Sequence, residues 1–397
     1  MSKENKQINY RIPVFCLATI LFWFAMYTYV PILGVYTTKL GASNKMTGII
    51  VGSYGFVQMI LRIPLGIASD KLHKRKLFIN FGLFFTFFSG IGLWIFKDLS
   101  LILVFRALAG ASAATWVDFT VLFTSYYKQE EATKAIGILN FYNYIAQMLA
   151  MLSGGFLAEK ISFESTFLLG AAVGIIGLIA SLFIAENYEE KGKKITLKGV
   201  VEVVQDRTLL SVSFLAVISQ LIAFATVFGF TPIFAQSLGA TKFDMSLLTV
   251  FSNLPSAFAS LIGGTYLSKK FGEKKVIVAG FIVMGIFTIT IPFTKNLWLL
   301  MITQALSGVG RGFSFPLLMG MSIQHMEMEK RATAMGFFQS IYGLGMFLGP
   351  VIIGVISDVM NLKQGFILFG ILGCITSFIA FYIIKKEKEG FLNKCRI

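Results

Sequence analysis

The chain alternates long apolar runs with short polar connections. Twelve runs of about 20 residues or more can be marked, and each is long enough to cross a bilayer as a helix. Because the bilayer core offers no water to unpaired backbone groups, spanning runs of this kind must be helical. The runs lie at about 12–34, 45–67, 77–96, 99–125, 135–157, 164–185, 208–235, 245–267, 275–294, 297–322, 332–356 and 365–384.

Polar side chains are distributed unevenly among these runs. The third run of each successive group of three, such as 77–96 or 275–294, is almost free of amide or charged side chains. Because polar groups within a bilayer face protein or a water-filled cavity, this pattern predicts four outer helices and eight around a central axis. The polar residues of the other eight runs include Gln58, Arg62, Arg106, Asp118, Asn140, Asn143, Gln147, Gln220, Asn253, Gln304, Arg311 and Gln339.

The two halves of the chain repeat each other. Residues 99–110 match residues 297–308 at an offset of 198, and Glu159 matches Asp358 at an offset of 199. Near-constant spacing across several runs indicates two parallel six-helix repeats, with Glu159 and Asp358 at outer helix ends as solvated or gate residues. The predicted organisation is a first bundle at 1–185, a cytoplasmic linker on the inner membrane surface at 186–207 and a second bundle at 208–397.

Composition and charge add the orientation. Hydrophobic residues make up 56% of the 397 residues and charged residues only 14%, whereas soluble domains average about 25% charged. The two terminal segments and the connections on the same side of the membrane hold 25 lysines and arginines, and the other connections hold seven. Since cytoplasmic loops collect such residues, both termini are predicted to be cytoplasmic. The net charge of +15 therefore indicates topology rather than nucleic-acid binding.

No arrangement of residues points to a metal, a cofactor or catalysis. Cys16, Cys374 and Cys395 show neither metal-ligand nor disulfide spacing, and the chain has only two histidines. The sequence contains no serine–histidine–acid set and no phosphate-binding loop. We therefore expect neither an enzyme nor a bound cofactor or metal.

Three motifs carry a resemblance to a transporter family. GIASDKLHKRK at 66–76 combines a glycine and an acid with paired bases, Arg106 is followed four residues later by Gly110, and GMFLGPVIIG at 345–354 gives Gly-xxx-Gly-Pro. The chain resembles a major facilitator superfamily transporter over nearly its whole length, in a branch of bacterial drug or metabolite exporters. His73 departs from the motif, which usually has glycine there, and the Gly-Pro signature lies on the eleventh run instead of the fifth.

The resemblance implies that the 66–76 connection belongs to a cytoplasmic gate. A carboxylate beside several cations attracts them, so the cluster would hold the gate shut and release it on opening. Asp118 lies about 28 Å along its helix, at the depth of Asp70, which fits an ionic partner of Lys74 or Arg75. A proton-carrying acid and a capping role stay open for Asp118. The gate residues implied are Gly66, Asp70, Lys71, Lys74, Arg75 and Asp118.

A second group of polar residues lies deeper in the membrane. Arg311 is about 21 Å along its helix, so it needs a partner, water or a substrate. Asn140, Asn143 and Gln147 share one helix face. The alternatives are a structural cation at Arg311 and interhelical hydrogen bonds by the amides. The candidate residues of a substrate cavity are Arg311, Asn140, Asn143, Gln147, Gln339, Tyr342, Tyr27 and Trp116.

A third group is expected to pack helices or to couple them. Its members are Arg106, Gly110, Gly345, Gly349 and Pro350. For Arg106, helix packing and control of a proton pathway are equally open.

The function expected is secondary transport in the cytoplasmic membrane, with proton-coupled efflux of small amphipathic drugs or metabolites by alternating access. One alternative is an importer of a small organic anion, which rests on Arg311 and Arg106. Another is a sensor with the same fold and no transport. The expected partners are a small-molecule substrate, protons and the lipid bilayer, with no nucleic acid, and the protein is expected to be a monomer.

Overall fold

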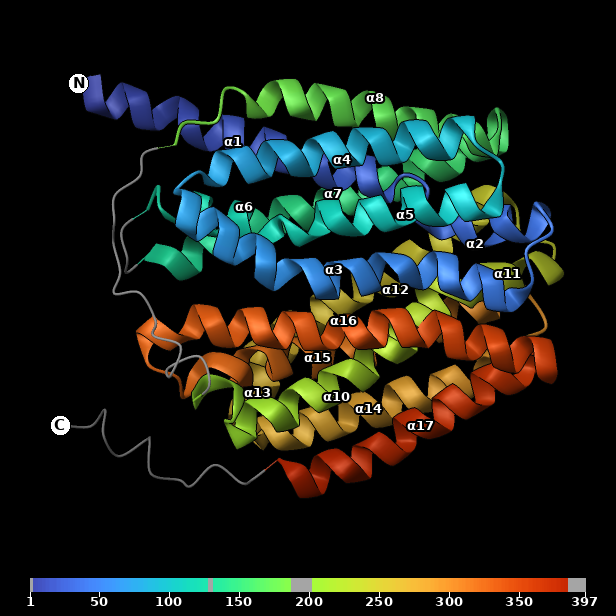
Figure 1. Cartoon of the computed structure of the whole chain (residues 1–397). Helices are drawn as coiled ribbons and strands as arrows, with labels where there is room; N and C mark the ends of the chain where they lie inside the picture. Colours follow the sequence, from blue (N-terminus) through green and yellow to red (C-terminus); the bar gives the residue numbers. More distant parts are fainter. Residues whose placement is uncertain (1–2, 128–130, 187–201, 385–397) are drawn as a thin grey trace.

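The computed structural model describes residues 3–127, 131–186 and 202–384, and almost all of them are helical (Figure 1). The first half contains α1 (Lys3–Tyr27), α2 (Val30–Lys39), α3 (Asn44–Leu72), α4 (Arg75–Ile95), α5 (Leu99–Ala114), α6 (Trp116–Thr124), α7 (Ala132–Lys160) and α8 (Phe163–Ser181). Most of the predicted linker at 186–207 and the basic tail after 384 lie outside the described residues.

The second half repeats this arrangement with short irregular segments inserted. It contains α10 (Arg207–Ala225), the π-helical segment η2 (Thr226–Phe230), α11 (Thr231–Ser237), α12 (Lys242–Ile262), the π-helical segment η3 (Gly263–Leu267), α13 (Ser268–Phe271), α14 (Glu273–Thr290), the 3₁₀ segment η4 (Ile291–Phe293), α15 (Leu297–Gln324), α16 (Met328–Val359) and α17 (Leu362–Ile383).

The predicted all-helical membrane fold is confirmed. Eleven segments of the described chain are long and apolar enough to cross a membrane. The twelfth predicted run is α15, a 28-residue helix that carries Gln304 and Arg311 and is not among these eleven. The helix axes run roughly parallel, and α1 begins at the end of the molecule where α17 finishes (Figure 1).

Two predicted runs of the first half are interrupted. The first is split between Tyr27 and Val30, and the fourth changes at Thr115 from α5 to α6. Pro31 stands in the first turn of α2, where its missing N–H costs no helical hydrogen bond. Pro232 takes the same place in α11. In each half, a proline within an apolar run therefore accompanies a change of helix.

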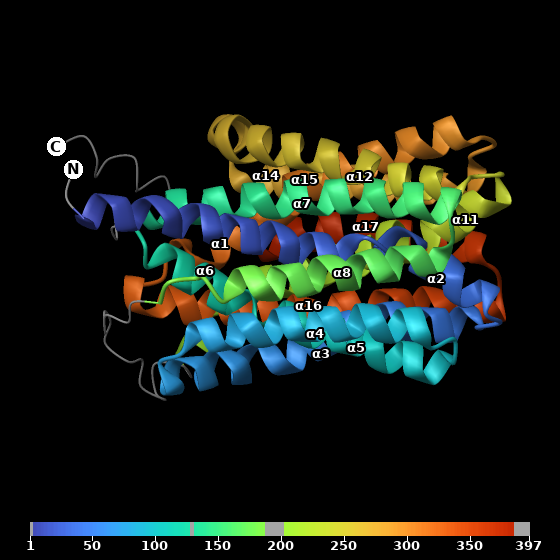
Figure 2. The ribbon, with the colours of Figure 1, turned by 90° about the horizontal axis from the view of Figure 1, so that it is seen from above.

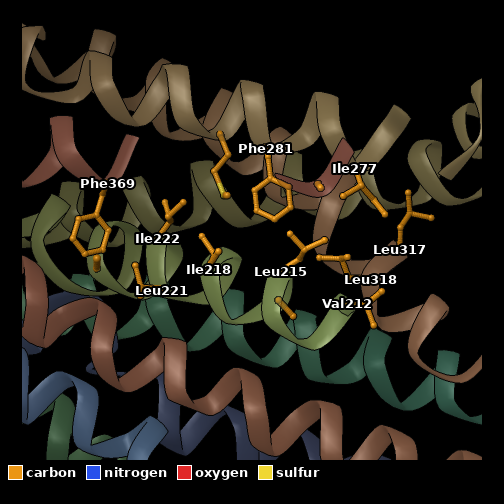
Figure 3. Close-up of a cluster of buried hydrophobic side chains, with 14 of the residues drawn as sticks. Val212, Leu215, Ile218, Leu221, Ile222, Ile277, Phe281, Leu317, Leu318 and Phe369 are labelled. Carbon is orange, nitrogen blue, oxygen red and sulfur yellow. The ribbon is translucent and has the colours of Figure 1, made fainter. Parts of the chain in front are cut away.

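Each half has a hydrophobic core of its own. In the second half, Ile277, Phe281 and Leu318 are fully buried within a cluster drawn from α10, α14, α15 and α17 (Figure 3). In the first half, the rings of Phe22 and Phe119 pack with centroids 4.6 Å apart. Because lipid tails are as apolar as these side chains, the cores hold mainly through close van der Waals contact.

Two long helix pairs make most of the contact between the halves. Helix α3 packs along α16 (Figure 1), and α7 packs along α12 (Figure 2). We call the end of the molecule with the α3–α4 turn, residues 72–75, the basic end. The opposite end is the one with the turns that precede Asn44 and follow Val359. The candidate site lies along these two pairs.

Candidate functional site

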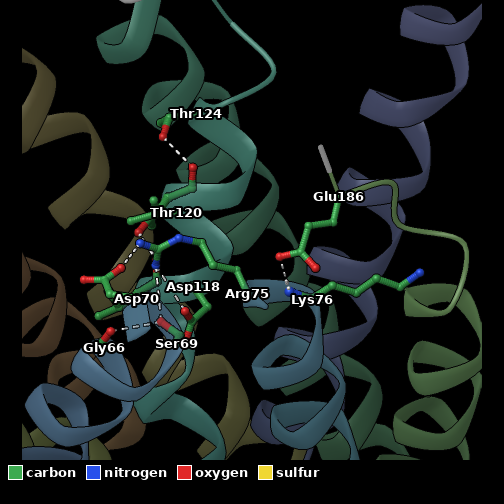
Figure 4. Close-up of polar contacts among 11 residues, drawn as sticks. Gly66, Ser69, Asp70, Arg75, Lys76, Asp118, Thr120, Thr124 and Glu186 are labelled. Atoms are coloured by element: carbon green, nitrogen blue, oxygen red, sulfur yellow. Dashed lines mark hydrogen bonds and ion pairs between the residues drawn. The ribbon is translucent and has the colours of Figure 1, made fainter. Parts of the chain in front are cut away.

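At the basic end, one arginine joins carboxylates from two helices. Arg75 Nη1 donates to Asp118 Oδ1 at 3.2 Å, and Arg75 Nη2 donates to Asp70 Oδ1 (Figure 4). Asp118 on α6 is fully buried, whereas the Asp70 side chain at the end of α3 is 63% exposed. A buried carboxylate is costly without a cation, so Arg75 compensates Asp118 while Asp70 holds the guanidinium from the solvent side.

The turn between α3 and α4 sets this geometry. α3 ends at Leu72, and His73 has a left-handed backbone with φ of 53°. Glycine is the usual residue in this conformation, and the motif that the chain resembles has glycine there. The turn is held further by Lys76, whose backbone N–H donates to Glu186 Oε1 at 3.1 Å (Figure 4).

The other residues of the implied gate make no such contact. Lys71 and Lys74 are exposed, and neither forms an ion pair with a carboxylate of the described residues. A Cβ added to Gly66 would have only Val117 within reach, at 4.0 Å. The side of α3 that Gly66 turns toward α6 is therefore loosely packed.

At the opposite end, carboxylates cap helices across the halves. Asp358 at the end of α16 accepts from the backbone N–H groups of Asn44 (3.0 Å) and Lys45 (2.8 Å) at the start of α3. Glu159 at the end of α7 accepts from the backbone N–H of Lys242 (2.9 Å) at the start of α12. A carboxylate there satisfies unpaired N–H groups and interacts well with the helix dipole. The two repeat-related acids thus make equivalent contacts.

Next to these caps, α3 and α16 touch backbone to backbone. A Cβ on Gly48 would lie 2.1 Å from the carbonyl oxygen of Pro350, and one on Gly52 would lie 2.6 Å from that of Phe347. Gly55 continues the same contact one turn further. We call this line of Gly48, Gly52 and Gly55 against α16 the glycine seam. Only glycine permits so close an approach.

Arg62 marks the place where this contact loosens. It lies two turns beyond Gly55 and donates through Nη1 to the carbonyl oxygen of Gln339 (3.5 Å) and the hydroxyl of Tyr342 (3.4 Å) on α16. Its side chain is 3% exposed, and Nε has no partner among the described residues. The sequence showed Arg62 only as one of several polar residues in spans. The argument made for Arg311, a cation deep in a membrane helix, applies to it equally.

Arg106 on α5 is enclosed by tyrosines. Its guanidinium carbon lies 4.5 Å from the ring centre of Tyr54 and 5.6 Å from that of Tyr29, and Nη1 reaches the Tyr29 hydroxyl at 3.5 Å. A Cβ on Gly110 would lie 2.4 Å from the carbonyl oxygen of Tyr54, so α5 and α3 are in close contact there. Aromatic faces, and no carboxylate of the described residues, surround this cation.

Arg311 lies in the middle of α15. Its Nη2 donates to Asn253 Oδ1 at 2.6 Å, and its guanidinium carbon is 5.9 Å from the ring centre of Phe228. The void beside it, lined in part by Thr226 and Ser307, measures about 10 Å³, which is room for about one water molecule. On its second-half side, the space beside Arg311 is therefore narrow.

The remaining amide candidates differ in their surroundings. Gln147 Nε2 donates to Asn143 Oδ1, so these two side chains satisfy each other on α7. Asn140, one turn before Asn143, is half-buried. Gln339 is half-buried on α16, where its backbone carbonyl is the group that Arg62 contacts.

The aromatic candidates belong to two ring clusters. In the first half, the ring of Trp23 lies 5.0 Å from that of Trp116 and 5.7 Å from that of Tyr27. In the second half, Tyr342 packs edge-on against Phe315 at 5.4 Å. Trp116 is buried, whereas Tyr27 and Tyr342 are half-buried.

The Gly-xxx-Gly-Pro motif lets α16 contact two helices at once. A Cβ on Gly345 would lie 2.0 Å from the carbonyl oxygen of Val217, and one on Gly349 would lie 2.2 Å from that of Leu221, both on α10. The carbonyl of Pro350 faces α3 in the glycine seam. One face of the motif therefore packs within the second half and the other packs across the halves.

A pocket of about 540 Å³ opens at the basic end between α1 and α7. Phe141 lines this pocket, and Tyr144 lies about one turn further along α7. Tyr144 keeps 57% of its surface exposed, yet Arg311 and Tyr342 of the second half lie within electrostatic range. Tyr144 is therefore not covered by the second half, although Arg311 and Tyr342 are near it. The pocket is lined by Ile12, Cys16, Tyr127, Gly137, Ile138, Phe141 and Tyr142.

Comparison with known proteins places this geometry in a family context. A model described as Major Facilitator Superfamily matches residues 15–234 and 212–394. An uncharacterised MFS-type transporter of Methanocaldococcus jannaschii is 24% identical over 372 residues, which cover 90% of this chain and 93% of that protein. The quinolone resistance protein NorA of Staphylococcus aureus is 23% identical over 341 residues, which cover 83% of this chain and 85% of NorA.

Solved structures show the same fold. The nucleoside transporter NupG, in a mutant form, superposes with a TM-score of 0.77 at 15% identity, and the match covers 94% of this chain and 100% of that one. A bacterial homologue of the human lysosomal transporter Spinster, in an inward-facing and unoccupied conformation, gives a TM-score of 0.76 at 17% identity, covering 96% and 98% of the two chains.

Proposed function

Because this chain belongs to the Major Facilitator Superfamily, whose members are transporters and not enzymes, we propose that it carries a small molecule across the membrane by alternating access. The two halves would rock about the region of Arg62 and Arg311. The basic end and the opposite end would close in turn, so that this region is open to one side of the membrane at a time. This movement separates it from a sensor that keeps the fold without transport.

The observation that carries the proposal is the difference between the two ends. At the opposite end, the carboxylate caps and the glycine seam hold the halves together. Toward the basic end, Arg62 makes only long contacts with α16, and Tyr144 is more than half exposed although Arg311 and Tyr342 of the second half are near it. A molecule that is closed at one end and parted at the other has the shape of one state of an alternating cycle.

We propose that the basic end faces the cytoplasm. The excess of lysine and arginine in its connections supports this orientation, and both termini would then be cytoplasmic. The protein would lie in the cytoplasmic membrane, and the described conformation would be open to the cytoplasm. Asp70 and Arg75 would contact the second half when the basic end closes and the opposite end opens.

We propose export driven by protons as the direction and the drive. Relatives named for resistance, NorA and the multidrug resistance protein 3 of Bacillus subtilis, support export. Asp118 supports proton coupling, because it is fully buried beside the gate and its Oδ2 atom has no partner among the described residues. Loss of its charge would weaken the Arg75 bridge and so free Arg75 to contact the second half, which would link protonation to closure of the basic end.

Two measurements test this proposal. Tyr144→Cys, in a variant without the native cysteines, should react with a membrane-impermeant maleimide in inside-out vesicles and not in right-side-out cells. Proteoliposomes should then accumulate a fluorescent quinolone when their lumen is made acidic, and Asp118→Asn should reduce the dependence on the pH gradient. Labelling from the outer face alone would overturn the orientation, and uptake that ignores pH would overturn proton antiport.

A further inference from the structure

The middle of the molecule holds an excess of positive charge. Arg62, Arg106 and Arg311 lie within spanning helices, and none pairs with a carboxylate of the described residues. The carboxylate furthest inside a span, Asp118, is already paired with Arg75. Moving an ion out of water costs several kcal/mol even after relaxation, so unpaired cations at this depth require a purpose.

Two of these cations have hydrogen-bond donors to spare. A guanidinium offers five N–H groups. Arg62 uses one nitrogen in two contacts longer than the usual 2.9–3.0 Å, and its buried Nε has no partner among the described residues. Arg311 makes one short bond, to Asn253. A bound acceptor could therefore take several strong bonds without displacing any partner from Arg62.

Tyrosines connect the two arginines into one region. Tyr342 receives the long bond from Arg62 and lies within electrostatic range of Tyr27 and Tyr144. Tyr27 and Tyr144 are in turn within electrostatic range of Arg311. Arg62 belongs to the first half and Arg311 to the second half. A group bound between them would contact both halves at once.

The surroundings of this region suit an apolar body. The rings of Trp23 and Trp116 lie on the first-half side, and Phe228 and Phe315 lie on the second-half side. Toward the basic end, a largely apolar pocket of about 540 Å³ lies between α1 and α7 of the first half. An aromatic or other apolar group attached to an acid would find both parts of its surface matched.

We infer that the transported molecule is an amphipathic organic anion, whose carboxylate or comparable group binds between Arg62 and Arg311 while its apolar part lies among the neighbouring aromatic rings. The inference rests on the proposed transport function and specifies its substrate class. The anion would draw Arg62 and Arg311 together and so favour closure of the basic end, which couples binding to the next step of the cycle.

The test compares three probes with the same ring system and different charge. They are 2-naphthoate, 2-naphthamide and 2-naphthylmethylamine, and their affinities are measured by tryptophan fluorescence on purified full-length protein in lipid nanodiscs. We expect naphthoate to bind about ten-fold or more tightly than the amide, because hydrogen bonds to charged groups contribute about 1.5–3 kcal/mol. The amine should bind weakest of the three.

Variants locate the preference. Arg62→Gln and Arg311→Gln should each remove most of the preference for the acid over the amide. Lys363→Gln, at the exposed start of α17 on the opposite end, removes the same charge elsewhere and should keep it. Arg62→Lys should recover part of it, which separates a charge effect from misfolding.

The outcomes separate the inference from the transport proposal. Equal binding of the three probes, a preference for the amine, no binding of any probe, or an acid preference that survives both Arg→Gln variants would overturn the inference. None of these results changes the Tyr144→Cys labelling or the quinolone flux, so transport would stand with a different substrate class. Naphthoate binding with no flux of any probe would contradict transport instead.

Discussion

The two carboxylate caps make the sharpest prediction, because they hold one end of the molecule shut through few contacts. In Asp358→Asn, the negative charge is lost, and only one side-chain oxygen remains to accept from Asn44 and Lys45. The amide NH₂ would face the second backbone N–H. The variant should therefore open the opposite end more often, while each half keeps its own core.

The size of the effect follows from the contacts. Losing an N-cap costs about 0.5–2 kcal/mol, and a charge at a helix terminus contributes about 0.3–1 kcal/mol. Since Asn keeps part of the cap, we expect a loss of about 1–2 kcal/mol, or about a 5- to 30-fold rise in the open population. Glu159→Gln removes the charge on the other helix pair and leaves one oxygen to accept from Lys242, and the two effects should add.

The assay uses a cysteine that is buried in the closed state. Ser246 on α12 is fully buried, and its Oγ would lie 2.3 Å from a Cβ placed on Gly155 of α7. Ser246→Cys, in a variant without Cys16, Cys374 and Cys395, should react with maleimide only when the halves part at this end. Because the rate follows the open population when closing is fast, Asp358→Asn should raise it by the same factor.

A matched control removes a carboxylate at the same end without touching the contact between the halves. Glu164 at the start of α8 lies 3.9 Å from Lys97, and both belong to the first half. Glu164→Gln should leave the labelling rate unchanged. If Asp358→Asn and the double variant label no faster than the parent, or if Glu164→Gln labels as fast as they do, the caps are not what closes this end.

The other predictions concern the basic end and the glycines. Arg75→Gln leaves Asp118 buried without its cation, so it should lower the free energy of unfolding by about 3–5 kcal/mol, measured by denaturant titration in detergent. Adding Asp118→Asn should restore most of this free energy, and no recovery would refute the pairing. Gly48→Ala would push a methyl group to 2.1 Å from the Pro350 carbonyl oxygen, so it should raise Ser246→Cys labelling, whereas Gly320→Ala meets nothing within 4 Å and should not. Gly345→Ala clashes within the second half, so it should lower the melting temperature without raising Ser246→Cys labelling. Faster labelling with an unchanged melting temperature would contradict the assignment of Gly345 to packing within the second half.

Much of the fold was predictable from the apolar runs alone. Their length and number fix a bundle of spanning helices, since lipid allows no other structure for them. Depth along a helix also placed Asp118 beside the bases of the α3–α4 turn, and the structure selects Arg75 over Lys74 as its partner. The repeat spacing paired Glu159 with Asp358 before their contacts were visible.

Other features depend on contacts that no local pattern encodes. Arg62 reaches Tyr342 across 280 positions of sequence, and its role emerges only when α3 lies against α16. Lys71 and Lys74 are chemically similar to Arg75, yet the left-handed turn at His73 leaves them in solvent. The narrow space at Arg311 depends on how the helices of the second half pack against one another, which no local sequence pattern encodes.

The glycine seam also determines how the halves come back together. The positions between its glycines include Ile50, Val51 and Tyr54, whose side chains are too large to lie against a carbonyl at these distances. A slip of α3 by one residue along α16 would place such a side chain where only a hydrogen fits. Steric exclusion therefore allows the glycine seam a single register. Each time α3 and α16 come together again, they return to that register without a change of side-chain rotamer.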